Sequence, residues 1–206
     1  MSLWPFLAVA AGYLLGNLPF GLLVGKIFYK IDVRLHGSGN IGTTNIFRTI
    51  GPGPALAVLI GDAGKGALAV LLGWLAGNGA PEWMFLAGAA AIVGHNWPVV
   101  LGFKGGRGIA TSLGVLITLM PTVTLLLLGI WLVVLALSRY VSLASIIAAM
   151  ALPVALLFFP QPRIYTLGSL VLSAFALYKH LPNIKRLRAG KEFKLGQKIS
   201  TDNQEK

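Results

Sequence analysis

Residues 37–48 form the segment of this chain that is best suited to bind an anion. They run Gly-Ser-Gly-Asn-Ile-Gly-Thr-Thr-Asn-Ile-Phe-Arg and lie between two long apolar segments. Glycines allow backbone N–H groups to turn toward a ligand, and Arg48 can hold a phosphate through two parallel hydrogen bonds. The alternative is an ordinary loop with helix caps, where Ser, Thr and Asn are frequent. The side chains that offer hydroxyl or amide groups are Ser38, Asn40, Thr43, Thr44 and Asn45.

Residues 102–108, Gly-Phe-Lys-Gly-Gly-Arg-Gly, form a second segment of this kind. It leads into a predicted helix, whose N-terminus carries free N–H groups and a positive dipole, and Lys104 and Arg107 add charge. The order differs from the GxxxxGK[ST] phosphate loop, and no βαβ pattern surrounds it. The alternative is an ordinary basic loop. Two such loops predict two phosphate-bearing substrates, or one substrate with two anionic ends.

Four further residues have side chains that could ionise during a reaction. Asp62 and Lys65 lie three residues apart inside an apolar segment, so they share one helix face. Ionisable groups within a membrane span are costly and face the bundle interior or water, so this pair is either a wall of the active site or a self-neutralising structural pair. His95 precedes the second loop, and histidine is the side chain best suited to move a proton near neutral pH. His180 opens the C-terminal segment, and either histidine could instead be structural.

The composition indicates an integral membrane protein. Of the 206 residues, 56% are hydrophobic and 11% are charged, against about 25% charged residues in soluble domains. The net charge of +11 does not indicate nucleic-acid binding, because the basic residues are scattered among loops and no nucleic-acid-binding pattern accompanies them. The absence of cysteine excludes disulfides, iron–sulfur clusters and thiolate zinc sites. We expect no metal and no cofactor.

The elements that must position these residues are seven apolar segments, and a full crossing takes about 20 residues. The fourth segment is short, and Met120-Pro121 separates it from the fifth, so the two are either one long helix or two crossings. The first segment lacks a basic leader and a cleavage site after it, so it is predicted to be a retained span. The predicted spans are 3–25, 53–77, 83–101, 109–119, 122–137, 143–159 and 164–179.

The placement of the charges favours seven crossings. Loops 26–52, 102–108 and 138–140 and the tail 180–206 then share one side, and only Arg163 of the 17 Lys and Arg lies on the other. The positive-inside bias makes the crowded side cytoplasmic. We therefore predict an all-α seven-helix membrane bundle over 1–197 with a polar tail over 198–206. The N-terminus lies outside, the C-terminus inside, and the fourth helix is tilted or only partly inserted.

Three blocks of the sequence resemble a known bacterial family. Residues 37–45, then 94–98 with 102–108, then His180 with 183–184 and 190–192, are similar to the blocks of the acyl-phosphate:glycerol-3-phosphate acyltransferases of the PlsY type. The resemblance runs from about residue 10 to 195. Relatives usually have a basic residue where this chain has Leu181, and they often have lysine in place of Arg107. The H-x4-D pair of other glycerol-phosphate acyltransferases is absent, because Ile41, Val100 and Lys185 follow the three histidines at that spacing.

The resemblance implies a fold, a reaction and partners. The fold is seven transmembrane helices with a cytosolic active site in the bacterial inner membrane. The reaction moves a fatty acyl group from acyl phosphate to the 1-hydroxyl of sn-glycerol 3-phosphate, giving lysophosphatidic acid and phosphate without a cofactor. The expected partners are these two substrates, the lipid bilayer and the soluble enzyme that makes acyl phosphate, and no nucleic acid.

The resemblance, together with the chemistry of the residues, also implies roles in the site. The base is either His95 or a phosphate oxygen of a substrate, which is basic enough to accept the hydroxyl proton. The acyl chain is expected to lie among the helices. The expected catalytic residues are His95, Lys104 and Arg107. Those expected to bind glycerol 3-phosphate are Ser38, Asn40, Thr43, Asn45, Arg48, His180 and Asn183. Those expected to bind acyl phosphate are Gly102, Lys104, Gly105, Gly106, Arg107 and Gly108. The expected supporting residues are Asp62, Lys65, Ser142 and Glu192.

Two other functions are compatible with polar loops on a membrane protein. A transporter for a phosphorylated solute would be expected to show broken helices at corresponding positions of two halves. A non-catalytic assembly protein would use its glycines for packing alone.

Overall fold

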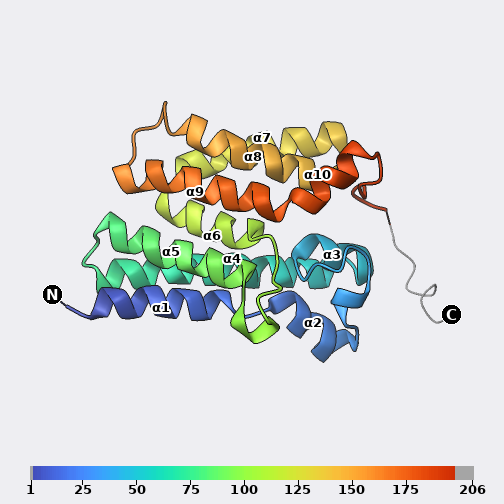
Figure 1. The fold of residues 1–206 in the computed structure, drawn as a ribbon, viewed down its shortest axis with the longest axis horizontal. Helices are drawn as coiled ribbons and strands as arrows, with labels where there is room; N and C mark the ends of the chain where they lie inside the picture. The colour runs from blue at the N-terminus through green and yellow to red at the C-terminus, as the bar shows by residue number, and fades with distance from the viewer. Residues whose placement is uncertain (1, 198–206) are drawn as a thin grey trace.

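The computed structural model describes residues 2–197, and all of the regular structure among them is helical (Figure 1). The polar tail that was predicted over 198–206 lies outside these residues. Two short 3-10 turns, Val33–Leu35 and Val99–Leu101, precede the two donor-rich segments, 37–48 and 102–108. The α-helices are α1 (Trp4–Gly16), α2 (Phe20–Tyr29), α3 (Thr43–Thr49), α4 (Pro52–Ala76), α5 (Pro81–Asn96), α6 (Ile109–Leu119), α7 (Pro121–Ser138), α8 (Val141–Ala155), α9 (Arg163–Lys179) and α10 (Leu181–Arg188).

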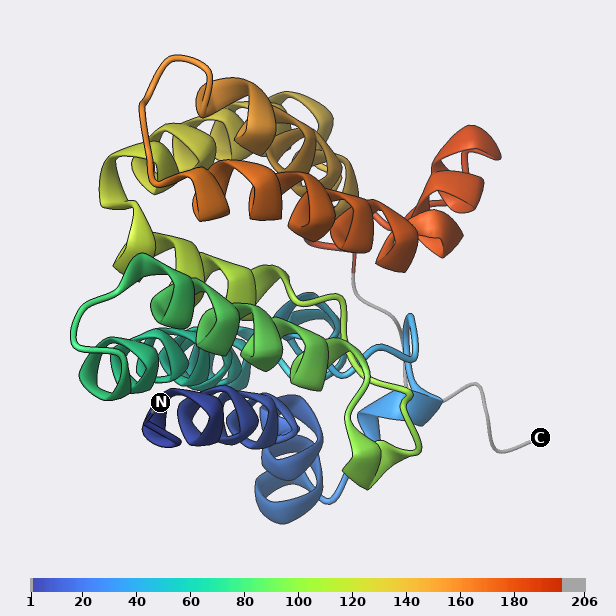
Figure 2. The ribbon, with the colours of Figure 1, turned by 60° about the vertical axis from the view of Figure 1, so that its left-hand side comes forward.

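The long helices pack in two groups that run side by side (Figures 1 and 2). One group contains α1, α4, α5 and α6, and the other contains α7, α8 and α9. The main apolar core joins the groups, because Val70 and Ile92 of the first and Val123 and Leu172 of the second belong to the same buried cluster. The short helices α2, α3 and α10 gather at one end of the bundle, opposite the end at which the N-terminus lies (Figure 1).

Glycine permits a close contact between α1 and α5. A Cβ atom on Gly12 would meet the carbonyl of Ala87, and one on Gly16 would meet the carbonyl of Ala91. Small residues at such spacing are the usual means by which membrane helices approach each other. Gly12 and Gly16 therefore have a packing role.

The apolar segment that was predicted as one span over 3–25 is divided in two. Helix α1 ends at Gly16, and α2 begins at Phe20 with its axis bent by 41° from that of α1. Pro19 lacks an N–H group and disfavours helical geometry at the residue before it, so the helix cannot continue through it. The Asn17 side chain then donates to the Tyr13 carbonyl (2.6 Å) and accepts from the Val99 N–H (2.6 Å), so the break is tied to the turn Val99–Leu101 that precedes the second loop.

The lengths of the helices confirm a membrane protein and leave the seven crossings as a prediction. Within the described residues, three helices are long and apolar enough to span a bilayer, α4, α5 with its following turn, and α7. The bent pairs α1–α2 and α9–α10 raise that number to five, and α6 and α8 are shorter apolar helices. Helices α6 and α7 are separate, because Met120 leaves the helical conformation and Pro121 begins the next helix.

Candidate active site

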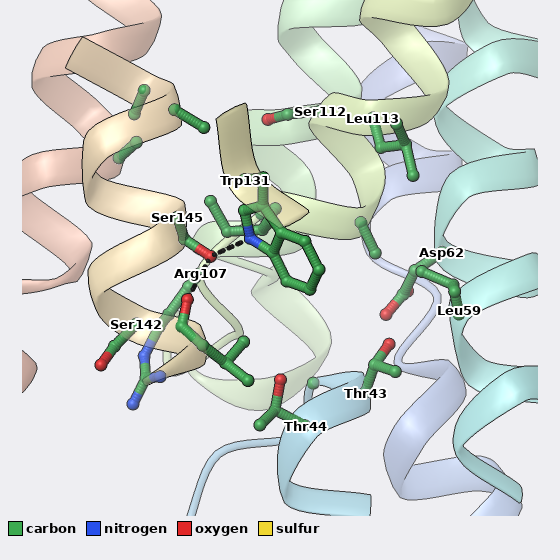
Figure 3. A pocket seen from close by; sticks show the side chains of 18 of the residues that line it. Thr43, Thr44, Leu59, Asp62, Arg107, Ser112, Leu113, Trp131, Ser142 and Ser145 are labelled. Carbon is green, nitrogen blue, oxygen red and sulfur yellow. Dashed lines mark hydrogen bonds between the residues drawn. The ribbon is translucent and has the colours of Figure 1, made fainter. Parts of the chain in front are cut away.

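A cavity of about 550 Å³ opens among the elements at the loop end of the bundle and extends between the helices. Its lining comes from the first loop and α3, from the start of α6, and from α4, α7, α8 and α9. Arg107, Ser142, Thr43 and Thr44 lie toward one end of it in the close view (Figure 3). The cavity therefore joins a polar mouth to an apolar interior.

The first loop is organised around the side chain of Asn45. Its Oδ1 accepts hydrogen bonds from the Ser38 N–H (2.9 Å) and hydroxyl (3.2 Å), and its Nδ2 donates to the carbonyls of Val33 (3.0 Å) and His36 (3.1 Å). Gly37 has a φ of 62°, and a Cβ there would collide with the Asn45 amide. Asn45 thus uses its hydrogen-bonding capacity to shape the loop, and this shape brings Ser38 and Thr43 to the cavity wall.

Arg48 lies in the last turn of α3 with only 6% of its surface exposed. Its Nη2 donates to the Phe193 carbonyl (3.1 Å), and the guanidinium lies over the Phe193 ring, 5.3 Å from the centroid. Among residues 2–197, Arg48 Nε and the Thr43 hydroxyl are buried without a hydrogen-bond partner. Buried donors normally have partners, so these two mark a place where a ligand oxygen would fit.

Glu192 ties the C-terminal segment to the site. Its Oε1 accepts hydrogen bonds from Ser142 Oγ (3.1 Å) and Asn183 Nδ2 (2.8 Å), and its Oε2 accepts from Arg186 Nε (2.7 Å). The Arg186 guanidinium also lies 5.9 Å from the Phe193 ring centroid. One carboxylate therefore connects α8, α10 and the segment that covers Arg48.

Arg107 adds a third guanidinium to this region. Burial and the charges of Arg186 and Arg48 lower the pKa of Arg107 to about 10, and Glu192 partly offsets this effect. Burial likewise lowers the pKa of Arg48. Both groups still carry their charge at neutral pH. Three arginines facing one glutamate leave an excess of positive charge, which suits the binding of a phosphate dianion.

The second loop lies flat against the end of α5. The Gly106 N–H donates to the His95 carbonyl (3.0 Å), and a Cβ atom on Gly106 would overlap the His95 ring. Gly108 has a φ of 79° and precedes α6. Arg107 lines the cavity, whereas Lys104 is exposed and does not line it. Gly105 and Gly106 therefore permit the close fit of this loop onto His95.

Lys65 stands at the centre of a buried polar cluster below that loop. Its Nζ lies 2.7 Å from Asp62 Oδ1 and 2.9 Å from His95 Nδ1, and it donates to the Leu18 carbonyl (2.7 Å). An ammonium group only donates, so His95 Nδ1 is the acceptor and Nε2 carries the ring proton. Asp62 and His95 line the cavity, while Lys65 stands behind them.

His180 lies where α9 meets α10, with 2% of its surface exposed. Its Nδ1 is 2.7 Å from the Ala176 carbonyl, and a carbonyl can only accept. Nδ1 therefore carries the proton, and in the neutral ring Nε2 is an acceptor. His180 lines the cavity, so its Nε2 is available to a ligand hydroxyl.

The comparisons with known proteins agree with these features. A family model described as glycerol-3-phosphate acyltransferase matches residues 6–190. The chain belongs to the glycerol-3-phosphate acyltransferase family. It is 50% identical to the glycerol-3-phosphate acyltransferase of Desulforudis audaxviator, over 90% of this chain and 93% of that protein. It is 47% identical to glycerol-3-phosphate acyltransferase 2 of Moorella thermoacetica, over 93% and 98% of the two chains.

Two crystal structures of PlsY, an integral membrane glycerol 3-phosphate acyltransferase, are similar to this family member. The glycerol 3-phosphate form superposes with a TM-score of 0.88 at 36% identity, over 93% of this chain and 96% of that one. The lysophosphatidic acid form gives 0.86 at 35% identity, over 93% and 95%. The resemblance drawn from the three sequence blocks is confirmed, and the protein is a glycerol-3-phosphate acyltransferase of the PlsY type.

The cavity of this acyltransferase gathers most, but not all, of the residues that the sequence singled out. Gly102, Lys104, Gly105 and Gly106 do not line it, nor do Lys65 and Asn183, which contact the lining residues His95 and Glu192. Sequence analysis missed the side chains that line the cavity from within the helices, among them Ser112, Trp131, Ser145 and Ser173. Ser142 and Ser145 are one helical turn apart on α8, a spacing that could have indicated a shared polar face. The predicted site residues that line the cavity are Ser38, Asn40, Thr43, Asn45, Arg48, Asp62, His95, Arg107, Gly108, Ser142, His180 and Glu192.

Proposed function

We propose that this enzyme transfers a fatty acyl group from acyl phosphate to the 1-hydroxyl of sn-glycerol 3-phosphate, releasing lysophosphatidic acid and inorganic phosphate. The observation that carries the proposal is the group of Arg48, Arg107 and Arg186 around the carboxylate of Glu192, because Arg48, Arg107 and Glu192 line an apolar cavity. A soluble phosphate ester and the phosphate end of a lipid-like donor would both find cations there. The fatty chain would find the apolar cavity directly behind them.

The roles of the site residues follow from the positions of the basic side chains. We assign Arg107, next to the N-terminus of α6, to the phosphoryl end of acyl phosphate, where its charge would stabilise the departing phosphate. We assign Arg48, Thr43 and Ser38 to glycerol 3-phosphate, because two of them present unpaired buried donors. His180 Nε2 would accept a hydrogen bond from the glycerol moiety. Exposed Lys104 would act through its charge at longer range.

The reaction needs one bond exchange at the acyl carbon. The glycerol hydroxyl oxygen forms a bond to that carbon, the bond from the carbon to the bridging oxygen breaks, and phosphate leaves. Acyl phosphate is already activated, so alignment of two mutually repelling anions is the main task, and alignment can supply about 7–11 kcal/mol. A substrate phosphate oxygen is the better base, because His95 Nδ1 already accepts a hydrogen bond from Lys65. His95 then positions the second loop.

The same proposal includes the orientation in the membrane. The loops rich in Lys and Arg lie at the end of the bundle that holds the cavity, which supports a cytoplasmic active site by the positive-inside bias (Figure 1). We therefore place the protein in the bacterial inner membrane, with its N-terminus outside and its C-terminus inside. The soluble enzyme that makes acyl phosphate would then meet this face.

Transport of a phosphorylated solute is less well supported. Two helix pairs are bent, α1–α2 and α9–α10, and both bends lie beside the end of α5, where Asn17 accepts from the Val99 N–H and Lys179 donates to the Asn96 carbonyl. Transporters of the inverted-repeat type place their broken helices around a site near the bilayer midplane. The bends here instead bring polar side chains to one face.

An assay can test directly which acyl donor the enzyme uses. Purified protein in a lipid mesophase would receive glycerol 3-phosphate with hexadecanoyl phosphate or with hexadecanoyl-CoA, and lysophosphatidic acid would be measured by mass spectrometry. We expect product from acyl phosphate and none from acyl-CoA. Arg163→Ala, which removes a charge at the opposite end of α9, is the control and should keep its activity. Product formed from acyl-CoA, or none from acyl phosphate, would contradict the proposal.

A further inference from the structure

Trp131 of α7 reaches across the cavity behind the polar mouth. Its indole Nε1 donates to Ser145 Oγ of α8 (3.1 Å), and that hydroxyl also lies 2.9 Å from the Val141 carbonyl. Ser145 is buried, with 3% of its surface exposed. The indole is thus held by a hydrogen bond between two helices. In the close view it lies between Ser145 on one side and Leu59 and Asp62 of α4 on the other (Figure 3).

The lining from α7 and α8 continues on both sides of this indole. Toward the loop end, one helical turn away, lie Leu135 on α7 and Ser142 on α8, the latter bonded to Glu192. Away from it the lining of α7 continues to Thr124, which is about 10 Å farther along the helix axis at 1.5 Å per residue. The side chains that line this far part are mostly aliphatic and include Leu116, Leu127, Leu128, Ala148, Ala149 and Leu152.

A long chain attached to a phosphate at Arg107 passes the indole when it extends into this aliphatic part of the cavity. Cores and pockets are closely packed, so a bulky aromatic side chain fixed by a hydrogen bond limits the cross-section of what can pass. A straight saturated chain can lie along the flat indole ring. A chain with a methyl branch at that depth would overlap it. A chain that ends before the indole would not meet it.

We propose that Trp131, held by Ser145, is a specificity-determining residue that selects straight acyl chains against branched ones in this transferase. The inference rests on the proposed donor and acyl site. The inference goes beyond the proposed donor and acyl site because it assigns chain selection to one side chain and names branching of the acyl chain as the property that is selected. Ser145 is a positioning residue in this account, since it acts only by fixing the indole.

The test measures selectivity with a series of acyl phosphates, so that a change in chain selectivity can be distinguished from a general loss of function. Wild type, Trp131→Ala, Trp131→Phe and Ser145→Ala would be compared with butanoyl, hexadecanoyl and mid-chain methyl-branched hexadecanoyl phosphate. We expect Trp131→Ala to raise the ratio of kcat/KM for the branched over the straight long chain about tenfold or more, as pockets typically discriminate small alkyl groups. Activity with the butanoyl donor should stay near that of wild type. Ser145→Ala and Trp131→Phe should shift the ratio less.

Two controls keep the outcome interpretable. Trp74→Ala removes an exposed tryptophan of α4 that does not line the cavity, and it should leave the ratio unchanged. Dissociation constants for non-reactive alkyl phosphates with the same chains should show the same shift, even if the donor proposal fails. An unchanged ratio in Trp131→Ala, or an equal loss with all three donors, would overturn the inference. Absence of transfer by wild type would instead overturn the proposed function alone.

Discussion

At the scale of single residues, the site is defined by which buried donors lack protein partners. Arg48 Nε, Thr43 Oγ1 and Arg186 Nη2 are buried and unpaired within the described part of the chain. Leaving a buried polar group unpaired costs about 1–3 kcal/mol, and more for a charged group. Two of these groups belong to one small region, because Arg48 and Arg186 both lie over the Phe193 ring, and this is the arrangement expected where a phosphate is to be bound.

Arg107 and Lys104 should differ sharply in their effect on catalysis. Arg107→Ala removes a cation that lines the cavity, so we expect kcat/KM for acyl phosphate to fall about a hundredfold or more. Lys104→Ala removes an exposed charge outside the cavity and should cost far less, with an effect that salt diminishes. Phosphate-release kinetics at two salt concentrations would check both. Equal losses in the two variants would contradict the roles proposed for them.

At the scale of elements, the buried pair on α4 couples that helix to α5 and to the break after α1. Lys65 contacts Asp62 on its own helix, His95 at the end of α5 and the Leu18 carbonyl after α1. Breaking a buried pair by removing one partner costs about 3–5 kcal/mol, because the other charge stays buried and uncompensated. The second loop rests on His95, so the cluster connects helix packing with the shape of the site.

A double-mutant cycle on this pair should show strong coupling. Lys65→Met alone leaves a buried carboxylate, and we expect it to lower stability by about 3 kcal/mol, with a matching loss of Tm in detergent. Adding Asp62→Asn should recover part of that loss, because the uncompensated charge is then gone. Additive losses in the double variant would show that Asp62 and Lys65 do not stabilise each other.

Substitution of a helical glycine by alanine should change stability differently according to what surrounds the glycine. Gly16→Ala places a methyl group against the Ala91 carbonyl and should destabilise the protein by about 1–3 kcal/mol, as overpacking typically does. Gly129→Ala in α7 meets nothing within 4 Å, so it should be neutral or stabilising by up to about 1 kcal/mol. Thermal unfolding of both variants provides the comparison. A destabilised Gly129→Ala, or an unaffected Gly16→Ala, would be contrary to this packing.

The sequence predicted the helix bounds well where an apolar segment is flanked by glycine, proline or a charged residue. The predicted bounds of the segments that became α4, α6, α7 and α9 differ by at most one residue from those found, because glycine, proline or charge marks each end. The break at Pro19 was missed, since residues on both sides are apolar. Both glycine-rich loops contribute to the lining of one cavity, the second through Arg107 and Gly108. In the second loop, Arg107 turns toward the cavity and Lys104 does not. This difference depends on how the loop packs against His95, which the spacing of the two residues in the sequence does not determine.

At the scale of the whole molecule, polar groups are concentrated at one end and apolar surface covers much of the rest. Large side chains such as Leu75, Leu125, Leu137 and Phe158 are exposed on the long helices or next to them, as expected for surfaces that contact lipid. The cavity begins at the polar end and extends into the bundle. A soluble phosphate ester and a lipid-borne donor could thus reach it from different phases.

The orientation can be tested because the chain contains no cysteine. Single cysteines introduced at Asn78 and at Lys30 lie between α4 and α5 and after α2, in loops predicted on opposite sides. In intact cells, a membrane-impermeant maleimide should label Asn78→Cys, and it should label Lys30→Cys only after permeabilisation. The opposite pattern would invert the proposed topology, and labelling of both in intact cells would place the two loops on one side.

The central claim is direct transfer between two anions held in one cleft, and a single-turnover experiment tests it most directly. Enzyme in excess would be mixed with labelled hexadecanoyl phosphate, with and without glycerol 3-phosphate, and quenched over time. We predict that neither free phosphate nor an acylated protein appears until glycerol 3-phosphate is added, after which phosphate and lysophosphatidic acid form at the same rate. A burst of phosphate without glycerol 3-phosphate, together with a protein-bound acyl group, would contradict the account.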